Sequence, residues 1–386
     1  MSQTERVPLS EVRDLIVVGE PLPFRVLDKP GRLLLNQGQM VATERQFETL
    51  VERGAWVERP QVEAVRAART TASAPPPAVA KRLLTVFDLW DSWAHDFGDL
   101  LRRASKGRAL AGEFESHSDA LTALVTRDAD VALYICTRQN GIQPALYPTL
   151  HAMHCAVTAA LTATQLAWPA EQVLSLARAA LTMNISAHDL QATLAEQHEP
   201  PSHKQLEALR AHPHAAAAML RTLGVSDALW LQTVEDHHEQ SDGKGYPRGV
   251  VPTVQAAQLL RIVDVYMAKI TGRAGRPPLP PVLAARQLFQ QQGMTPLASG
   301  LIRTLGVHPP GALVQLQSGE VAVVSRRGKS GPAPMVATLS NRQGKPVVET
   351  QHRDSAAPEF AISGPLMDAR NFSRVLPERV FGMVMA

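Results

Sequence analysis

The sequence has little cysteine and no long apolar run, and each shortage excludes a class of protein. Its two cysteines, Cys136 and Cys155, are too few for a disulfide framework or a thiolate metal cluster. No stretch approaches the ~20 apolar residues that span a bilayer. The first ten residues also lack the basic start and apolar core of a secretion signal. We therefore expect a cytoplasmic protein with reduced thiols and no membrane segment.

The chain also lacks a block of like charge. It has 39 Lys and Arg against 36 Asp and Glu, a formal net charge of +3, with no long basic stretch that could follow a phosphate backbone. A nucleic acid polymer is therefore not an expected partner. The hydrophobic content of 45% over 386 residues is enough to bury at least one large core, with smaller modules attached.

Composition predicts a small α/β module over residues 1–60, followed by a linker. Two apolar runs, FRVL and LLL, flank a turn-like DKPG, and TERQFETLVERG reads as a helix. In that helix Thr43 can serve as the cap and Gly54 as the end, with apolar residues at helical spacing between them. Residues 61–82 are rich in Ala and Pro, which predicts an extended spacer.

The rest of the chain is expected to be mainly helical and to end in a β-rich element. Long helices are predicted over residues 83–105 and 110–139, a lead-in to further helical patterns that run through residues 140–300 and indicate a bundle. In residues 301–386 the runs ALVQL and VAVVS flank a Ser-Gly turn, and MVATLS and KPVVET follow. The predicted fold class is therefore mainly α, with small modules at both ends.

The chemical signal is a set of histidines and one aspartate at separated positions. A single histidine is more often a scattered surface residue than a ligand. Facing helices could nevertheless bring these side chains together, as in metal sites of helical bundles, and imidazole and carboxylate suit Mn, Fe or Zn. The candidate metal ligands are His151, His212, His237, His238 and Asp264.

The most specific motif is HHEQSDGKGYP, at residues 237–247. Its glycines, Gly243 and Gly245, allow backbone angles closed to other residues, Asp242 can hydrogen-bond the turn, and Pro247 fixes its exit. Tyr246 would thereby be held in one place, as part of a binding loop. Taken alone, the segment reads equally well as an ordinary turn between helices.

This segment resembles the signature of the HD-GYP family of cyclic-di-GMP phosphodiesterases, and the resemblance covers about residues 140–300. It implies an HD-domain-like helical bundle, a metal-dependent hydrolase activity and a role in bacterial signal transduction. His151 resembles the first metal ligand of the family, His212 a later one, and Asp264 the closing aspartate. The loop would be the place where such proteins meet a diguanylate cyclase-type partner.

The sequence departs from that family at the His-Asp pair and the nearby Lys. The stretch AALTMNISA puts Met183 and Asn184 at the positions of the pair and Ala187 at that of the lysine. The sequence His188-Asp189 spells the pair five residues later, but using it would require compensating gaps. No confident catalytic residue remains, and we expect a degenerate active site.

At most one divalent metal is expected, or none. A thioether is a poor substitute for imidazole and an amide is a poor bridge, so the metal that His151 and Asp264 would share is expected to be lost. His212, His237 and His238 could still hold one ion, or they could be metal-free polar remnants.

Three functions stay open at this point. The first is a catalytically impaired signalling protein that binds a cyclic dinucleotide or a signalling partner. The second is an active cyclic-di-GMP phosphodiesterase with a reduced metal centre. The third is a helical interaction scaffold whose linker and end modules bind partners.

Overall fold

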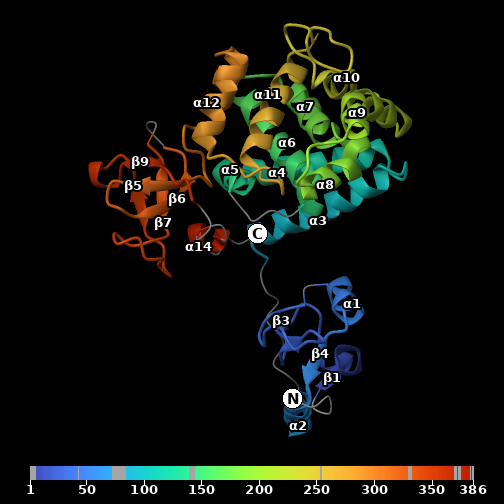
Figure 1. Cartoon of the computed structure of the whole chain (residues 1–386), viewed down its shortest axis with the longest axis vertical. Coiled ribbons are helices and arrows are strands. Elements are labelled where there is room, and N and C mark those ends of the chain that lie inside the picture. The colour runs from blue at the N-terminus through green and yellow to red at the C-terminus, as the bar shows by residue number, and fades with distance from the viewer. Residues whose placement is uncertain are drawn as a thin grey trace. The chain divides into compact units, whose positions relative to one another are not determined.

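The computed structural model describes residues 6–41, 43–71, 84–138, 144–252, 254–328, 333–368, 372, 375–382 and 384. The chain divides into two compact units, Met1–Arg82 and Leu83–Ala386 (Figure 1). The predicted fold class is confirmed, since the chain is mainly helical and has small sheets toward both termini. The finer domain limits proposed from composition stay predictions.

The first unit is a small antiparallel sheet with helices. Thr43 caps α1 as expected, because its side chain accepts a hydrogen bond from the backbone N–H of Gln46 at 3.1 Å. The strand order is β1-β4-β2-β3. The elements in chain order are β1 (Arg6–Pro8), η2 (Leu9–Leu15), β2 (Val26–Leu27), β3 (Leu33–Leu35), α1 (Glu44–Glu52), β4 (Trp56–Glu58) and α2 (Arg59–Thr71).

Helix α2 corrects the expected spacer, because it occupies the first half of the segment read as an extended linker. Val62 and Val65 lie one turn apart on the face of α2 that packs on the core of this unit, and that burial outweighs the alanine-rich composition. The remainder of the predicted linker, residues 72–82, lies outside the described residues.

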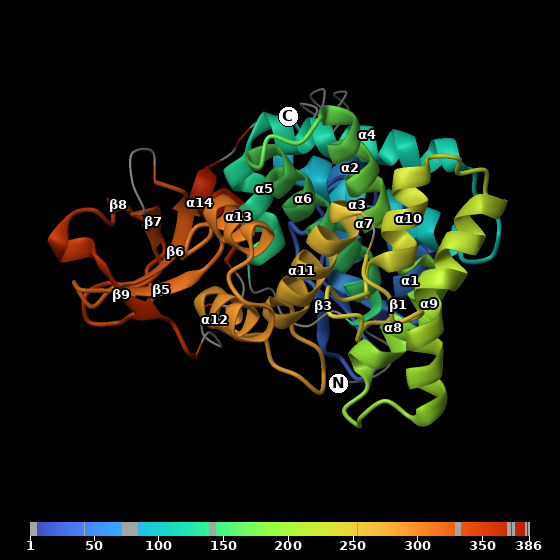
Figure 2. The ribbon, with the colours of Figure 1, turned by 90° about the horizontal axis from the view of Figure 1, so that it is seen from above.

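The second unit contains the predicted helical bundle. Helix α6 is its centre and is buried along most of its length, with α7 and α11 packed beside it (Figures 1 and 2). The helices are α3 (Val86–Ala104), α4 (Ala111–Arg127), α5 (Ala129–Thr137), η3 (Pro144–Leu146), α6 (Tyr147–Gln165), α7 (Ala170–Thr182), η4 (Ile185–Ala187), α8 (His188–Glu196), α9 (His203–Thr222), α10 (Ala228–Asp236), α11 (Gln255–Ile270), α12 (Pro281–Gln292) and α13 (Pro296–Leu305).

Asp128 breaks the single long helix that was expected over residues 110–139. Its carboxylate accepts hydrogen bonds from the backbone N–H groups of Asp130 and Val131, at 3.0 and 3.1 Å, and so begins α5 as a new helix. The same carboxylate forms an ion pair with Arg326 at 2.8 Å. The break therefore also fixes the C-terminal sheet against the helices.

That C-terminal sheet is antiparallel, with the strand order β8-β7-β6-β5-β9. The runs ALVQL, VAVVS and MVATLS form strands as predicted, but KPVVET does not, because β8 begins only after it. Val348 within that run is 91% exposed, so its apolar side chain gains nothing from the core. The elements are β5 (Leu313–Leu316), β6 (Val321–Arg326), β7 (Met335–Thr338), β8 (His352–Asp354), η5 (Pro358–Phe360), β9 (Ile362–Pro365) and α14 (Pro377–Phe381).

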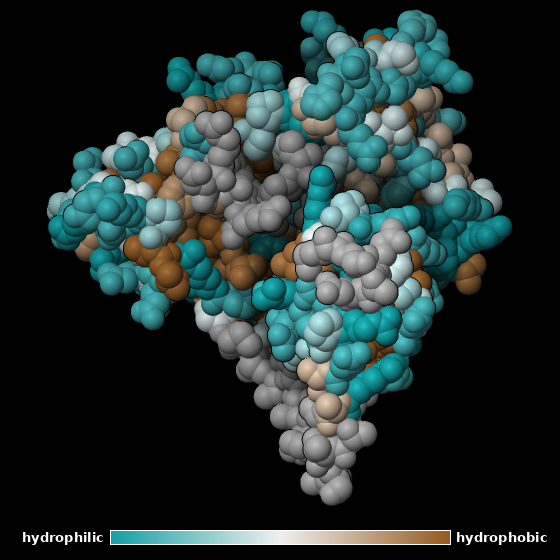
Figure 3. Space-filling model, turned by 60° about the horizontal axis from the view of Figure 1, so that its bottom comes forward, coloured by the Kyte–Doolittle hydropathy of each residue, from teal (hydrophilic) through white to brown (hydrophobic). Residues whose placement is uncertain are grey.

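The molecular surface shown in Figure 3 carries hydrophobic residues in patches among hydrophilic ones. Among the described residues, none of the helices combines the length and apolar character needed to cross a membrane.

We predict that Asp227→Ala weakens the helix that leads into the candidate site. Asp227 caps α10 by accepting from the Trp230 N–H at 3.0 Å, and its other oxygen accepts from the Ser175 hydroxyl at 2.5 Å. Losing both bonds should lower the free energy of unfolding by about 1–3 kcal/mol in urea titration. Asp96→Ala is the control, because the exposed Asp96 carboxylate has no recorded partner in the described chain. Equal losses in the two variants would contradict the assignment.

Candidate metal centre

His151 lies in the second turn of α6 and pairs with Asp264 of α11. It is 1% exposed, and its Nε2 is 2.7 Å from Asp264 Oδ1. Tyr147, one turn earlier, stacks on the imidazole with ring centroids 5.4 Å apart. Arg273 donates a hydrogen bond to the Tyr147 hydroxyl at 2.6 Å and lies over its ring. The imidazole is thus held between a carboxylate and a fixed aromatic ring.

His212 and His237 are held by backbone carbonyls of their own helices. His212 Nδ1 is 2.6 Å from the carbonyl oxygen of Leu209, and His237 Nδ1 is 2.7 Å from that of Val234. A carbonyl oxygen only accepts, so each Nδ1 carries the hydrogen. In the neutral rings both Nε2 atoms are then unprotonated lone-pair acceptors.

These two acceptors face each other. His212 Nε2 and His237 Nε2 are 3.2 Å apart, a distance suited to a hydrogen bond for which neither neutral ring supplies a hydrogen. His238 completes the group, and one ligand atom from each of the three residues lies within 4.8 Å of the others. A cation between the imidazoles would satisfy lone pairs that otherwise repel, and such backbone-oriented imidazoles are typical of metal ligands.

Protonation is a poor alternative for these rings. Burial lowers the pKa of His212 to about 3, with a further contribution from His237. Burial also lowers the pKa of His237, and it lowers that of His238 well below the ordinary value. The three imidazoles therefore remain neutral at neutral pH and keep their lone pairs available.

Asp264 supplies the negative charge of the site. Burial acts to raise its pKa, but the hydrogen bond from His151 and the neighbouring imidazoles outweigh burial and hold the pKa well below its usual range. Its second oxygen, Oδ2, is 4.0 Å from His238 Nδ1. The carboxylate thus adjoins both His151 and the three-imidazole group. The five predicted ligands therefore come together in one place.

Cys155 is a member of the site that the sequence analysis took for a structural thiol. It is fully buried one turn after His151, and its Sγ is 3.7 Å from His151 Nε2. His151, Cys155 and Asp264 form a second group whose ligand atoms lie within 4.8 Å of one another. Burial raises the pKa of the thiol well above its ordinary value. The signal that could have found it is its i, i+4 spacing from His151.

The predicted binding loop is built as its residues suggested. Asp242 Oδ1 accepts from the Lys244 N–H at 3.0 Å, and Gly243 has a φ of +72°. A Cβ on Gly245 would lie 2.4 Å from the Cα of Glu239, so this position requires glycine for close approach. The Tyr246 ring stacks on His238 with centroids 4.5 Å apart, ahead of a cis peptide bond to Pro247. The loop therefore lies directly against the histidines.

Glu239 anchors this loop and was not singled out from the sequence. It is 1% exposed, and its carboxylate accepts hydrogen bonds from the backbone N–H groups of Arg248, Gly249 and Val250, at 2.7, 3.2 and 3.0 Å. A carboxylate with three backbone donors is well satisfied when buried. The sequence signal that could have identified Glu239 is its position directly after His237 and His238.

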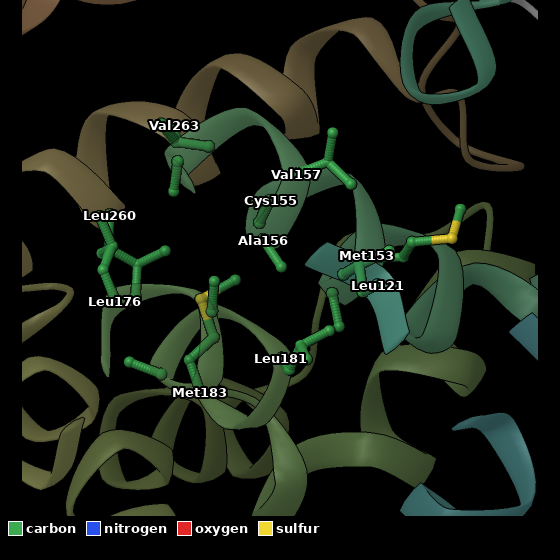
Figure 4. Close-up of a cluster of buried hydrophobic side chains, with 14 of the residues drawn as sticks. Leu121, Met153, Cys155, Ala156, Val157, Leu176, Leu181, Met183, Leu260 and Val263 are labelled. Carbon is green, nitrogen blue, oxygen red and sulfur yellow. The ribbon is translucent and has the colours of Figure 1, made fainter. Parts of the chain in front are cut away.

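Met183 and Asn184 lie at the end of α7 and differ in their surroundings. Met183 is fully buried and belongs to the apolar cluster that includes Leu176, Leu260 and Val263 (Figure 4). Asn184 is 9% exposed, and no side-chain hydrogen bond of Asn184 is recorded in the described chain. Ala187 is also buried. Of these three residues, Met183 is the one whose long apolar side chain packs in the core of the bundle.

The sequence His188-Asp189 stays apart from the ligand groups. His188 Nδ1 lies 3.0 Å from Asp189 Oδ1, but the Asp189 side chain is 86% exposed. Neither residue belongs to the two groups of ligand atoms found among the described residues. The structure therefore gives no support to an alignment with gaps that would make His188 and Asp189 the His-Asp pair.

Comparison with known proteins identifies the domain. Residues 115–294 match the HD domain family, so this chain contains an HD domain, and the resemblance drawn from the HHE and DGKGYP residues is confirmed at that level. A cyclic di-GMP phosphodiesterase of Pseudomonas aeruginosa is 26% identical over 260 residues, which cover 65% of this chain. The chain spans 62% of the length of that relative.

A solved structure also overlaps with this chain. It is a protein of Bdellovibrio bacteriovorus described as an HDG"Y"P protein, with 15% identity and a TM-score of 0.49 over 78% of this chain and 98% of its own. The residues described above agree with the family match, which shows an HD domain over residues 115–294, and with the similarity of this chain to a cyclic di-GMP phosphodiesterase.

We predict that His212→Ala lowers the metal content of the purified protein. The variant removes one of three converging imidazoles, and loss of a ligand should weaken affinity at least about tenfold. The matched control is His214→Ala, two residues along α9, because the His214 side chain is 67% exposed and pairs with Glu235. Elemental analysis should show less zinc or iron in the first variant and a normal content in the second. Equal contents would contradict a three-imidazole site.

The metal-free protein should lose stability as the pH falls from about 7 to 5. Histidine in the unfolded chain takes up a proton near pH 6.5, whereas burial lowers the pKa of folded His212 to about 3. The unfolded state therefore binds more protons in this window, which favours unfolding by up to about 1.4 kcal/mol per pH unit for each such histidine. His212→Gln should flatten the pH dependence of the unfolding free energy in urea titrations, and His214→Gln should not. An unchanged slope in His212→Gln would refute this explanation.

Proposed function

We propose that this chain is a signalling protein that binds a cyclic dinucleotide over a divalent ion held by His212, His237 and His238, with little or no hydrolysis. The observation that carries the proposal is the pair of unprotonated Nε2 atoms facing each other at 3.2 Å, each fixed by a backbone carbonyl on the other side of its ring. Three buried, neutral imidazoles suit Zn²⁺ or Fe²⁺.

A half-buried cation, Arg261, lies beside the site and supports an anionic ligand. Arg261 lies three residues before Asp264 on α11 and is half-buried, so burial lowers its pKa. No hydrogen bond or ion pair of its guanidinium is recorded among the described residues. It interacts electrostatically with Asp264 and with Tyr246. A guanidinium in this position is suited to a phosphate of the ligand, because its donors match two phosphate oxygens.

The chain's own residues would then divide the work of binding. The three imidazoles would hold the ion, Arg261 would orient a phosphate, and the face of Tyr246 beside His238 would lie next to a base or ribose. A bound divalent ion would supply Lewis-acid stabilisation of phosphate oxygens. The relative of Pseudomonas aeruginosa is a cyclic di-GMP phosphodiesterase, which supports cyclic di-GMP as the first ligand to test.

The side chains around this centre support impaired hydrolysis. Met183 is part of the apolar core, and its thioether carries neither a charge nor a proton that it could donate. Ala187 carries no cation to stabilise developing charge. No group in the set of predicted site residues is placed as a general acid for the leaving oxygen. Binding of a cyclic dinucleotide needs neither a lysine at position 187 nor a general acid, whereas its hydrolysis by the chemistry that the resemblance implies would need such groups.

An active phosphodiesterase with a reduced centre is the second candidate. Three imidazoles leave coordination positions open, which is the arrangement of catalytic rather than structural zinc sites. The scaffold reading is the third, and it requires neither metal nor nucleotide. The three candidate functions differ in whether one preparation of the protein should bind a metal ion and cyclic di-GMP, and in whether it should hydrolyse the nucleotide.

We predict that the metal-loaded protein binds cyclic di-GMP without converting it, and that Arg261→Gln weakens this binding at least about tenfold, because one charge-assisted phosphate contact is lost. Calorimetric titration measures binding, and chromatography of the same samples measures linear product. Arg286→Gln is the control, because Arg286 is exposed on α12.

The outcomes separate the candidate functions. Metal-dependent turnover would favour the reduced-centre enzyme. Absence of both binding and turnover would favour the scaffold. Equal affinity in the Arg261 and Arg286 variants would reject the assigned phosphate contact while leaving the metal site to its own test.

A further inference from the structure

Cys155 has no place in the ligand set that the HD-GYP resemblance implies, yet it lies among ligands. It follows His151 by one turn on α6, and both face Asp264 on α11. Helices α6 and α11 pack against each other along this face. The cysteine is fully buried, and it forms no disulfide. Cys155 therefore packs among apolar side chains (Figure 4) and also lies within reach of two ligand atoms.

We propose that Cys155 is a metal ligand and that His151, Cys155 and Asp264 hold a second, thiophilic divalent cation such as Zn²⁺. This inference rests on the metal-binding function proposed above and adds a ligand and an ion to it. The donor set of one sulfur, one imidazole nitrogen and one carboxylate oxygen is of the kind zinc accepts, with a fourth position open. Thiolate would favour zinc over Mn or Mg, which prefer oxygen ligands.

The observed distances are close to those of such a site. A tetrahedral zinc ion lies about 2.3 Å from sulfur and about 2.0 Å from nitrogen or oxygen, which places sulfur and nitrogen about 3.5 Å apart and nitrogen and oxygen about 3.3 Å apart. Cys155 Sγ and His151 Nε2 are 3.7 Å apart, and His151 Nε2 and Asp264 Oδ1 are 2.7 Å apart. The hydrogen-bonded pair would need to open by roughly 0.6 Å to admit the ion.

Charge balance also favours this set in a buried place. A thiolate and a carboxylate together neutralise a divalent cation, so the loaded site carries no net charge into the interior. The side chains of His151 and Cys155 are almost inaccessible, and that of Asp264 is 14% exposed. The three imidazoles alone, by contrast, would leave their ion with its full charge, which Asp264 beside them offsets only in part.

The thiolate would replace a ligand that the chain has lost. His151 and Asp264 alone offer two donors, and Met183 stands in the apolar cluster where the resemblance expects a further imidazole. Cys155 belongs to the same apolar cluster as Met183 (Figure 4), and its Sγ is 3.7 Å from His151 Nε2. The inference thus reverses the expectation that this first metal position is empty.

Cobalt substitution of the whole protein tests the thiolate directly, because a sulfur ligand gives a near-ultraviolet charge-transfer band that nitrogen and oxygen ligands do not. We expect about two cobalt ions per chain and this band. Cys155→Ala should lose one ion and the band, and His212→Ala should lose one ion and keep the band. The matched control is Cys136→Ala, since Cys136 is equally buried but belongs to neither ligand group found in the described chain; it should behave as wild type.

Zinc X-ray absorption of the unmodified protein gives a second readout that needs no variant to fold. About one sulfur for every two zinc ions, at about 2.3 Å, is expected. Cobalt bound without the band, a band that persists in Cys155→Ala, or a zinc shell of nitrogen and oxygen alone would overturn the thiolate ligand and leave the three-imidazole site standing. Failure to bind any cobalt or zinc would overturn both.

Discussion

Two hydrogen bonds to the backbone set the chemistry of this domain. The carbonyl oxygens of Leu209 and Val234 each accept from an Nδ1–H, so the neutral rings of His212 and His237 must turn unprotonated nitrogens toward each other. Burial lowers the pKa of His212 and that of His237, so protonation of one ring does not supply the missing hydrogen at neutral pH. A buried pair of acceptors is costly without a partner, and the surrounding helices hold the rings there. A cation is the partner that fits this constraint.

Much of this arrangement could be predicted from sequence because helical period and motif spacing carry it. Periodicity detects the inward-facing positions of helices and the helix ends, and these are the positions of the five ligands, His151, His212, His237, His238 and Asp264. The loop could also be predicted, because its glycines allow a positive φ at Gly243 and a close backbone approach at Gly245. The mainly helical class followed from the same patterns.

What sequence could not supply depends on burial and on long-range contacts. Helix α2 forms where composition predicts a spacer, because two valines find a core to pack on, and KPVVET fails to form a strand because its apolar side chains find none. Cys155 looked structural because a buried cysteine in a helix usually is. Its proposed role as a ligand depends on where Asp264, 109 residues later, meets α6, and a local sequence pattern does not report this contact.

Met183, at the position where the HD-GYP resemblance predicts an imidazole, affects more than the number of ligands. Met183 joins the apolar packing between α7 and α11, so its side chain lowers the local dielectric on that side of the ligand groups. A drier wall strengthens every remaining charge interaction, including that between the Asp264 carboxylate and the imidazoles around it. It also makes net charge more expensive to bury, which favours a ligand set that neutralises its ion. A thiolate beside a carboxylate meets that demand, and a phosphate held by Arg261 would meet it for the ion at the three imidazoles.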